Sequence, residues 1–260
     1  LTNLDIIQSF MGLVSENFHC SNPLHRLGEI RAFEQGVPDS KSKANFALQL
    51  HLRSAYREVS DLLQRCSLTH IPVKGLYLEQ LYRPIPRTSG DLDILVSQQS
   101  LSEIIDALGE IGYRKKSPGE FIQQLEESHS IELINSNTGI ELDLHFRMAE
   151  PCYGFMVDLE GILSDYPARA TEFQLLFSAI HSAKSGFSCL RDLLDIAVLY
   201  NEVVSLDKQR EAQSLFRDSN LAKLFTLIQE QHDCLIQTPK KQSKLMTLSL
   251  GHKGRLSKEI

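Results

Sequence analysis

Apolar positions in the first 66 residues recur every three or four residues, which is the spacing of one helix face. Two such series are present, one in Leu4, Ile7 and Met11 and one in Phe46, Leu50, Val59, Leu62 and Leu63. Two breaks divide the region. Residues 21–23 are an N-cap followed by proline, and residues 36–40 are a loop. The pattern predicts three helices in an N-terminal helical region over residues 1–66.

The hydrophobic period changes to two in residues 67–150, where short β-prone runs alternate with turn residues. Strands are expected at residues 71–73, 92–96, 130–134 and 140–146, and the last two flank a hairpin signal at residues 135–139. Apolar residues Leu101 to Ile111 fit one helix face, and a short helix is expected after Pro118-Gly119. This central part is predicted to be a mixed α/β core.

Helical spacing returns after Pro151, in apolar series around residues 173–180, 190–198 and 221–228. These series predict a C-terminal helical region over residues 151–238. Residues 239–260 carry six Lys and Arg against one acid with little periodicity, so a loose basic tail is expected. The expected fold class is α+β, a small mixed sheet flanked by helices.

Composition excludes several classes of protein. The 27 Lys and Arg against 33 Asp and Glu give a formal net charge of −6, which lacks the basic excess of a dedicated duplex-DNA binder. Five cysteines without a CxxC pair indicate neither a disulfide framework nor a zinc site, so a reducing, cytoplasmic setting is expected. Apolar runs are far shorter than the ~20 residues of a membrane span, and no membrane partner is expected.

The first candidate for chemistry is the segment Ser89-Gly90-Asp91-Leu92-Asp93, where a turn leads into a strand. A period of two places Asp91 and Asp93 on the same face, ~6–7 Å apart. Two like charges at that spacing repel unless a cation neutralises them, and oxygen ligands suit Mg²⁺ or Mn²⁺. The alternative is a solvated strand edge, since the DxD pattern is short.

A second strand favours the metal hypothesis. Glu141, Asp143 and His145 alternate on one face, opposite the apolar residues between them. A third carboxylate is then available beside the pair, and three acids from neighbouring strands are able to hold two metal ions for displacement at phosphorus. For His145 the alternatives are a partly buried structural histidine and a role in the site, and His129 is a weaker candidate for the same cleft.

Several motifs together resemble the uncharacterised nucleotidyltransferase family of the DNA polymerase β-like nucleotidyltransferase superfamily. The motifs are Lys74-Gly75, Tyr82-Arg83-Pro84-Ile85-Pro86, Arg87, Gly90-Asp91-Leu92-Asp93, Gly112-Tyr113 and Asp143-Leu144-His145. The resemblance spans about residues 68–147 and is weaker around His181, Lys184, Leu190 and Asp195. One departure is Lys74-Gly75, where the superfamily more typically has Gly-Ser, so a serine hydroxyl that contacts phosphate is missing.

The resemblance implies a nucleotidyltransferase-like core and metal-dependent nucleotidyl transfer from an NTP, with ATP as the expected substrate. Asp91, Asp93 and Asp143 would be the catalytic metal ligands for Mg²⁺ or Mn²⁺, and Asp143 is also a candidate base. The candidate nucleotide and phosphate ligands are Lys74, Gly75, Arg87, Gly90, His181 and Lys184. For Arg87 a surface ion pair, and for His181 and Lys184 a solvated helix face, are the alternatives.

The acceptor stays open, because its specificity depends on the shape of the cleft and not on the acids. A small-molecule hydroxyl, a peptide or protein side chain and, with less support, RNA are the candidate acceptors. Two alternatives to nucleotidyl transfer also stay open: phosphoryl transfer from the same site, and a non-catalytic module that binds a nucleotide or partner.

Overall fold

The computed structural model describes residues 2–17, 40–82, 87–117, 121–155, 157–187 and 189–236. The helix expected after residues 21–23, the candidate Arg83 and the basic tail lie outside these ranges. The other strands and helices expected from the sequence lie inside the described ranges.

The chain forms two compact units. One contains Pro38–Gln80 and Arg87–Ala168, and the other contains Leu1–Val37, Leu81–Pro86 and Arg169–Ile260. The first is called the sheet unit below and the second the helical unit. Helix α3 (Ser40–Arg65) belongs to the sheet unit.

The sheet unit contains a five-stranded mixed sheet in the order β1-β2-β5-β4-β3. Its strands are β1 (His70–Pro72), β2 (Leu92–Val96), β3 (Tyr113–Lys115), β4 (Ser130–Asn135) and β5 (Glu141–His145). Only β2 and β5 run parallel, and the other neighbouring pairs are antiparallel. The predicted α+β class with a small mixed sheet is confirmed.

The predicted hairpin is formed by β4 and β5, which pair antiparallel. Asn135 organises the turn, because its side-chain oxygen accepts hydrogen bonds from the backbone N–H groups of Asn137 and Thr138 at 2.9 and 3.1 Å. Gly139 has a φ of 72°, which glycine adopts without the steric cost that a Cβ brings. These turn residues fix the register in which β5 carries its polar side chains.

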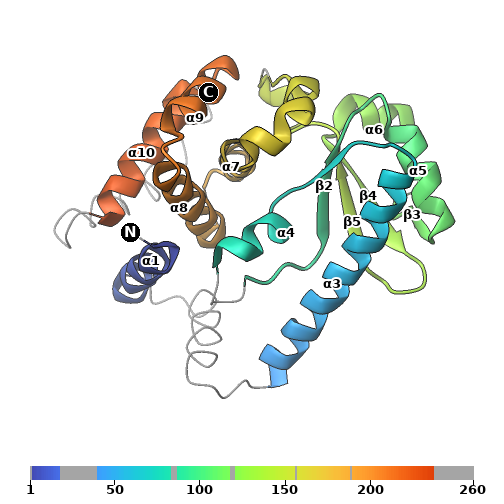
Figure 1. Ribbon diagram of the computed structural model, residues 1–260, viewed down its shortest axis with the longest axis horizontal. Helices are drawn as coiled ribbons and strands as arrows, with labels where there is room; N and C mark the ends of the chain where they lie inside the picture. The colour runs from blue at the N-terminus through green and yellow to red at the C-terminus, as the bar shows by residue number, and fades with distance from the viewer. Residues whose placement is uncertain are drawn as a thin grey trace. The chain divides into compact units, whose positions relative to one another are not determined.

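One face of the sheet forms the main apolar core. Leu92 and Ile94 of β2 and Leu142 and Leu144 of β5 are fully buried and pack with apolar residues of α3 and α5. Helix α5 (Leu101–Glu110) is the amphipathic helix that the spacing predicted. Figure 1 shows α3 and α5 beside the strands.

Short elements complete the sheet unit. They are α4 (Gly75–Leu78), α6 (Phe121–Glu127), the 3₁₀ helix η2 (Pro151–Tyr153) and the first half of the 3₁₀ helix η1 (Glu79–Tyr82), whose last two residues belong to the helical unit. Helix α6 confirms the short helix predicted after Pro118-Gly119. Helix α7 (Leu159–Lys184) contains Pro167 and has non-helical backbone angles at Arg169, so it bends where the sheet unit ends.

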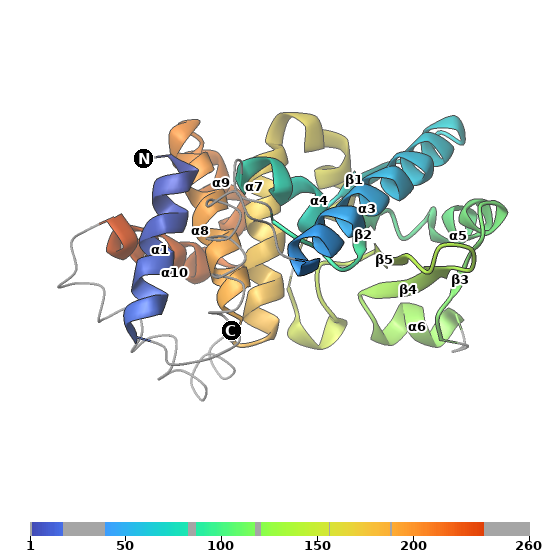
Figure 2. The ribbon, with the colours of Figure 1, turned by 90° about the horizontal axis from the view of Figure 1, so that it is seen from below.

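The helical unit contains the second part of α7 together with α1 (Asn3–Asn17), α8 (Leu190–Ser205), α9 (Gln209–Asp218) and α10 (Ala222–Ile236). Helices α1, α8 and α10 contact one another, as Figure 2 shows. Within this unit, the Tyr82 hydroxyl donates a buried hydrogen bond of 2.6 Å to Asp195 of α8. Among the described helices, none combines the length and apolar character that crossing a membrane requires.

Candidate active site

Two carboxylates lie directly opposite each other in the parallel strands of the sheet. Asp93 on β2 pairs with Asp143 on β5 in the strand register, and Glu132 on β4 pairs with Asp143 from the other side. The apolar neighbours of Asp93 and Asp143 point to the α3 and α5 face, so alternation puts both acids on the opposite face. The parallel pairing of β2 and β5 thus brings together acids that are 50 residues apart in the sequence.

Asp93 is held as a charged group. Only 3% of its side chain is exposed, and its Oδ1 accepts hydrogen bonds from Lys74 Nζ at 2.7 Å and from His145 Nε2 at 2.8 Å. Burial on its own would raise the pKa of Asp93. The His145 hydrogen bond and the Lys74 charge outweigh burial and hold the pKa of Asp93 below its ordinary value.

Asp143 has the opposite electrostatic environment. Its pKa is raised to about 7, first by burial and then by the negative charge of Asp93, while Lys74 lowers it in part. The charges of Asp91 and Glu132 add to the increase. Several acids therefore converge on one position with too little positive charge to neutralise them all.

The Lys74-Gly75 pair connects β1 to α4 in an unusual backbone conformation. Lys74 has a φ of 51°, which is uncommon for a residue with a Cβ and costs conformational free energy. Gly75 leaves room for residues 87–89, which precede β2. A Cβ at Gly75 would overlap Ser89 and lie 3.3 Å from a guanidinium nitrogen of Arg87. The backbone here brings Lys74 to Asp93 and lets the segment before β2 approach closely.

Arg87 lies inside the fold and not on its surface. Its side chain is 8% exposed and passes beside Gly75. The alternative considered from the sequence was an ion pair at the surface. That alternative requires an exposed side chain, and the side chain of Arg87 is buried. Its assignment as a phosphate ligand stays a prediction.

Asp91 and Gly90 precede the strand and are not part of it, since β2 begins at Leu92. The Ser89 hydroxyl donates to Asp91 Oδ1 at 3.3 Å, and the negative charge of Asp91 contributes to the raised pKa of Asp143. A Cβ at Gly90 would meet no described atom within 4 Å. Packing among the described residues therefore gives no reason for glycine at this position.

The donor set fits a hard divalent cation. One potential ligand atom from each of Asp93, Asp143 and His145 lies within 4.8 Å of the other two. Nε2 of His145 must carry a hydrogen to bond to the carboxylate of Asp93, so in this arrangement it acts as a donor and not as a ligand. The carboxylates remain as ligands, and oxygen ligands suit Mg²⁺ or Mn²⁺.

Two histidines extend the site away from the acids, and the sequence had left both roles open. His145 is 1% exposed, and its ring lies 5.4 Å from the ring of His129, measured between centroids. Nδ1 of His129 lies 3.2 Å from a carboxylate oxygen of Glu150. The alternation of Asp143 and His145 was the only sequence signal for this arrangement, and no local pattern pointed to Glu150.

His181 and Lys184 lie at the end of α7, in the helical unit. The other candidate residues described above belong to the sheet unit. The assignment of His181 and Lys184 as nucleotide ligands stays a prediction.

Comparison with known proteins gives one family. A family model described as uncharacterised nucleotidyltransferase matches residues 39–230, which cover most of the chain. The match includes the five strands, helix α3 and the helices from α4 to α9. A search of curated proteins finds no match.

Proposed function

Because the chain belongs to the family of uncharacterised nucleotidyltransferases, we propose that it transfers a nucleotidyl group from an NTP to a hydroxyl acceptor. ATP is the first candidate for the NTP. The observation that carries the proposal is the pair of carboxylates, Asp93 and Asp143, placed opposite each other on parallel strands beside Lys74. An NTP substrate is consistent with a cytoplasmic location, and we propose that location for the protein.

Asp91, Asp93 and Asp143 would hold Mg²⁺ or Mn²⁺. The ion would supply positive charge beside the phosphates and favour ionisation of the acceptor hydroxyl. Burial, and after it the negative charge of Asp93, raises the Asp143 pKa, and a divalent cation would neutralise that charge. His145 donates to Asp93 and fixes the orientation of that carboxylate.

The phosphate contacts would come from the predicted cationic and glycine positions. Lys74 would supply positive charge in place of the serine hydroxyl that the superfamily more typically has, and Arg87 would add a guanidinium suited to phosphate oxygens. Gly90 would let the backbone approach the triphosphate, and Gly75 would bring Ser89 and Arg87 close to Lys74. His181 and Lys184 would contact the nucleotide or the second substrate from α7.

The reaction conserves atoms and charge in one displacement. The acceptor oxygen forms a bond to the α-phosphorus, and the bond from that phosphorus to the bridging oxygen of the β-phosphate breaks. Pyrophosphate leaves with the bonding electron pair, and the acceptor proton passes to a base. Asp143 is the candidate for that base among the residues of the site.

A labelling experiment tests the proposal. The protein is incubated with Mg²⁺, a cell extract as acceptor source and each NTP labelled on either the α- or the γ-phosphorus. We expect label from the α-position in a product, and we expect Asp93→Asn to reduce its formation by about 1,000-fold or more. Transfer of γ-label instead would show phosphoryl transfer and contradict the proposal.

The control for folding is Asp106→Asn, the same change at an exposed position on α5. We expect this variant to keep the wild-type rate and unfolding temperature. Unchanged turnover in Asp93→Asn, with normal metal dependence, would remove Asp93 from the catalytic site.

A further inference from the structure

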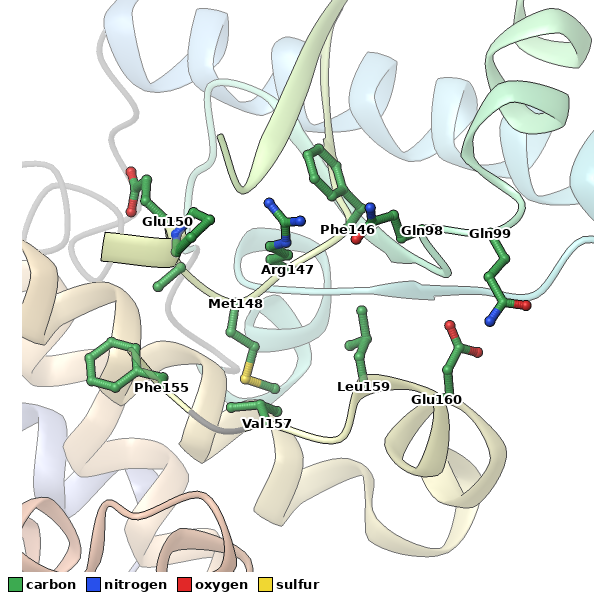
Figure 3. Close-up of a pocket in the computed structure, with 12 residues that line it drawn as sticks. Gln98, Gln99, Phe146, Arg147, Met148, Glu150, Phe155, Val157, Leu159 and Glu160 are labelled. Carbon is green, nitrogen blue, oxygen red and sulfur yellow. The ribbon is translucent and has the colours of Figure 1, made fainter. Parts of the chain in front are cut away.

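A cavity of about 750 Å³ lies in the sheet unit, apart from the acids themselves. Three groups of residues line it: Gln98 and Gln99 after β2, residues 146–151 after β5, and Phe155, Val157, Leu159 and Glu160 around the start of α7. Figure 3 shows these residues around the open space. None of them was singled out by the sequence patterns.

The position of the cavity relates it to the candidate active site. It adjoins the carboxyl ends of β2 and β5, the parallel strands that carry Asp93 and Asp143. Ligands of open α/β sheets commonly bind outside the carboxyl ends of parallel strands. The cavity therefore begins beyond the carboxyl ends of these strands, five residues after Asp93 along β2 and three residues after Asp143 along β5.

A chain of side chains joins the cavity wall to the buried acid. Glu150, in the wall, lies 3.2 Å from His129, whose ring is 5.4 Å from that of His145. His145 in turn donates to Asp93 at 2.8 Å. Two imidazole rings therefore separate the wall of the cavity from the carboxylate proposed to hold the metal ion.

The cavity has a carboxylate toward each end, and Arg147 lies beside its apolar middle. Met148 and Leu159 lie in the middle, while Glu150 and Glu160 lie toward opposite ends (Figure 3). At the Glu160 end, the side chain of Gln99 adds an amide. The Ser97 hydroxyl donates to Glu160 Oε1 and so holds this carboxylate at the cavity.

Arg147 also lines the cavity, and backbone carbonyl groups hold its guanidinium. Its guanidinium Nη1 donates to the backbone oxygens of Leu125 at 2.6 Å and Ser128 at 3.2 Å. These bonds turn the guanidinium toward the end of α6, where carbonyl groups lack helical partners. The Glu160 carboxylate and the Gln99 amide are therefore the polar groups at the end of the cavity opposite Glu150.

We propose that this cavity binds the acceptor of the nucleotidyl transfer and that the acceptor is a small organic molecule with an amine and an apolar body. The inference rests on the proposed function, because an acceptor subsite presupposes the transfer. Glu160 would bind the protonated amine, and Met148 and Leu159 would contact the apolar body. The hydroxyl that receives the nucleotidyl group would point from the cavity toward Asp143.

Three related compounds test the chemistry of the cavity: tyramine, 4-methylphenol and 4-hydroxyphenylacetate. They share a phenol and differ in carrying an amine, no charge or a carboxylate. We expect tyramine to bind about tenfold or more tightly than 4-methylphenol, and 4-hydroxyphenylacetate to bind most weakly, in titrations followed by saturation-transfer NMR. Equal binding of the three compounds would overturn the proposal.

Two variants locate the binding. Leu159→Trp fills the middle of the cavity and should weaken the binding of all three compounds. Glu160→Gln should remove most of the preference for tyramine over the other two. Glu103→Gln, the same change at an exposed position on α5, is the matched control and should change neither result. Tyramine binding that survives both cavity variants would place the compound elsewhere and overturn the proposal.

A separate titration distinguishes failure of this inference from failure of the proposed function. Binding of Mn²⁺ with a non-hydrolysable ATP analogue is measured in the wild type, in Asp93→Asn and in Leu159→Trp. We expect Asp93→Asn to lose this binding and Leu159→Trp to keep it. Loss of tyramine selectivity with normal Mn²⁺ and nucleotide binding overturns the acceptor site alone. Absence of Mn²⁺ and nucleotide binding in the wild type overturns the proposed function and the acceptor role together.

Discussion

The two faces of the sheet are made from alternate residues of the same strands, yet they affect stability in opposite directions. On β2, Leu92 and Ile94 are completely buried against the α3 and α5 side, and burying apolar surface favours the folded state. Asp93 lies between them on the other face, where it meets Asp143. The polar face brings like charges together, which lowers the free energy of unfolding and creates a place for a cation.

The largest expected effect on stability comes from the apolar face. Leu144→Ala removes a fully buried side chain from the centre of β5, and we expect it to lower the free energy of unfolding by about 3 kcal/mol. The unfolding temperature should fall by roughly 6–12 °C in thermal denaturation. Leu206→Ala, at a side chain that is 48% exposed, is the control and should have little effect. A fall of less than 2 °C for Leu144→Ala would contradict the assignment of this face as the core.

The next effect concerns metal binding on the polar face. Asp143 must be ionised to bind a cation, and its pKa of about 7 means that protons compete with the metal below that pH. Mn²⁺ affinity should fall about tenfold per pH unit below pH 7 and level off above it, as measured by calorimetry. An affinity that stays constant between pH 5.5 and 7 would show that Asp143 is not a ligand.

A smaller effect is expected when the charge of Asp143 is removed without metal present. Its pKa is raised from 3.8 to about 7 in the folded state, so the carboxyl group favours folding while it is protonated. That contribution is complete below about pH 4 and is lost as the pH rises through 7. Asp143→Asn should therefore stabilise the protein at pH 8, on the order of 1–2 kcal/mol after allowance for solvent screening.

Thermal unfolding at pH 8 and pH 4 checks the sign of this prediction. The unfolding temperature of Asp143→Asn should exceed that of the wild type at pH 8, and the two proteins should converge at pH 4. Asp106→Asn is the control for the loss of an exposed carboxylate. A variant that is less stable at pH 8 would show that the ionised Asp143 stabilises the fold.

The smallest effect is expected at the rim of the polar face. Lys116 pairs with Glu141 at 2.9 Å and with Glu132 at 3.5 Å, but all three side chains are solvent-exposed by 40% or more. Exposed ion pairs contribute little because water screens them. Lys116→Met should shift the unfolding temperature by no more than about 2 °C, and the shift should shrink in high salt. A larger shift would show that the rim also supports the sheet.

Local patterns were sufficient to predict most elements of the sheet unit. The alternation in β5 and the turn residues around Asn135 predicted the hairpin, since both signals depend on residues close in sequence. The same patterns did not predict that α3 packs in the sheet unit. That assignment depends on which apolar faces meet, and periodicity describes only one face at a time.

The candidate site was predictable in part for the same reason. The alternation of residues placed Asp143 and His145 on one face of a strand, and the DxD pattern drew attention to Asp93. No local signal predicted that Lys74 and His145 would both bond to Asp93, or that Glu150 would approach His129. These contacts join residues from separate strands and loops.

The sequence by itself determined which residues alternate on each strand, where the hairpin turns and which acids are available for a cation. Only the tertiary structure decided that β2 and β5 are neighbours, that Asp93 faces Asp143 and that the two acids have opposite pKa shifts. The physical reason is the range of the interactions. Period and turn geometry act over a few residues, whereas strand order, burial and the charge around a carboxylate depend on segments that meet only in the folded chain.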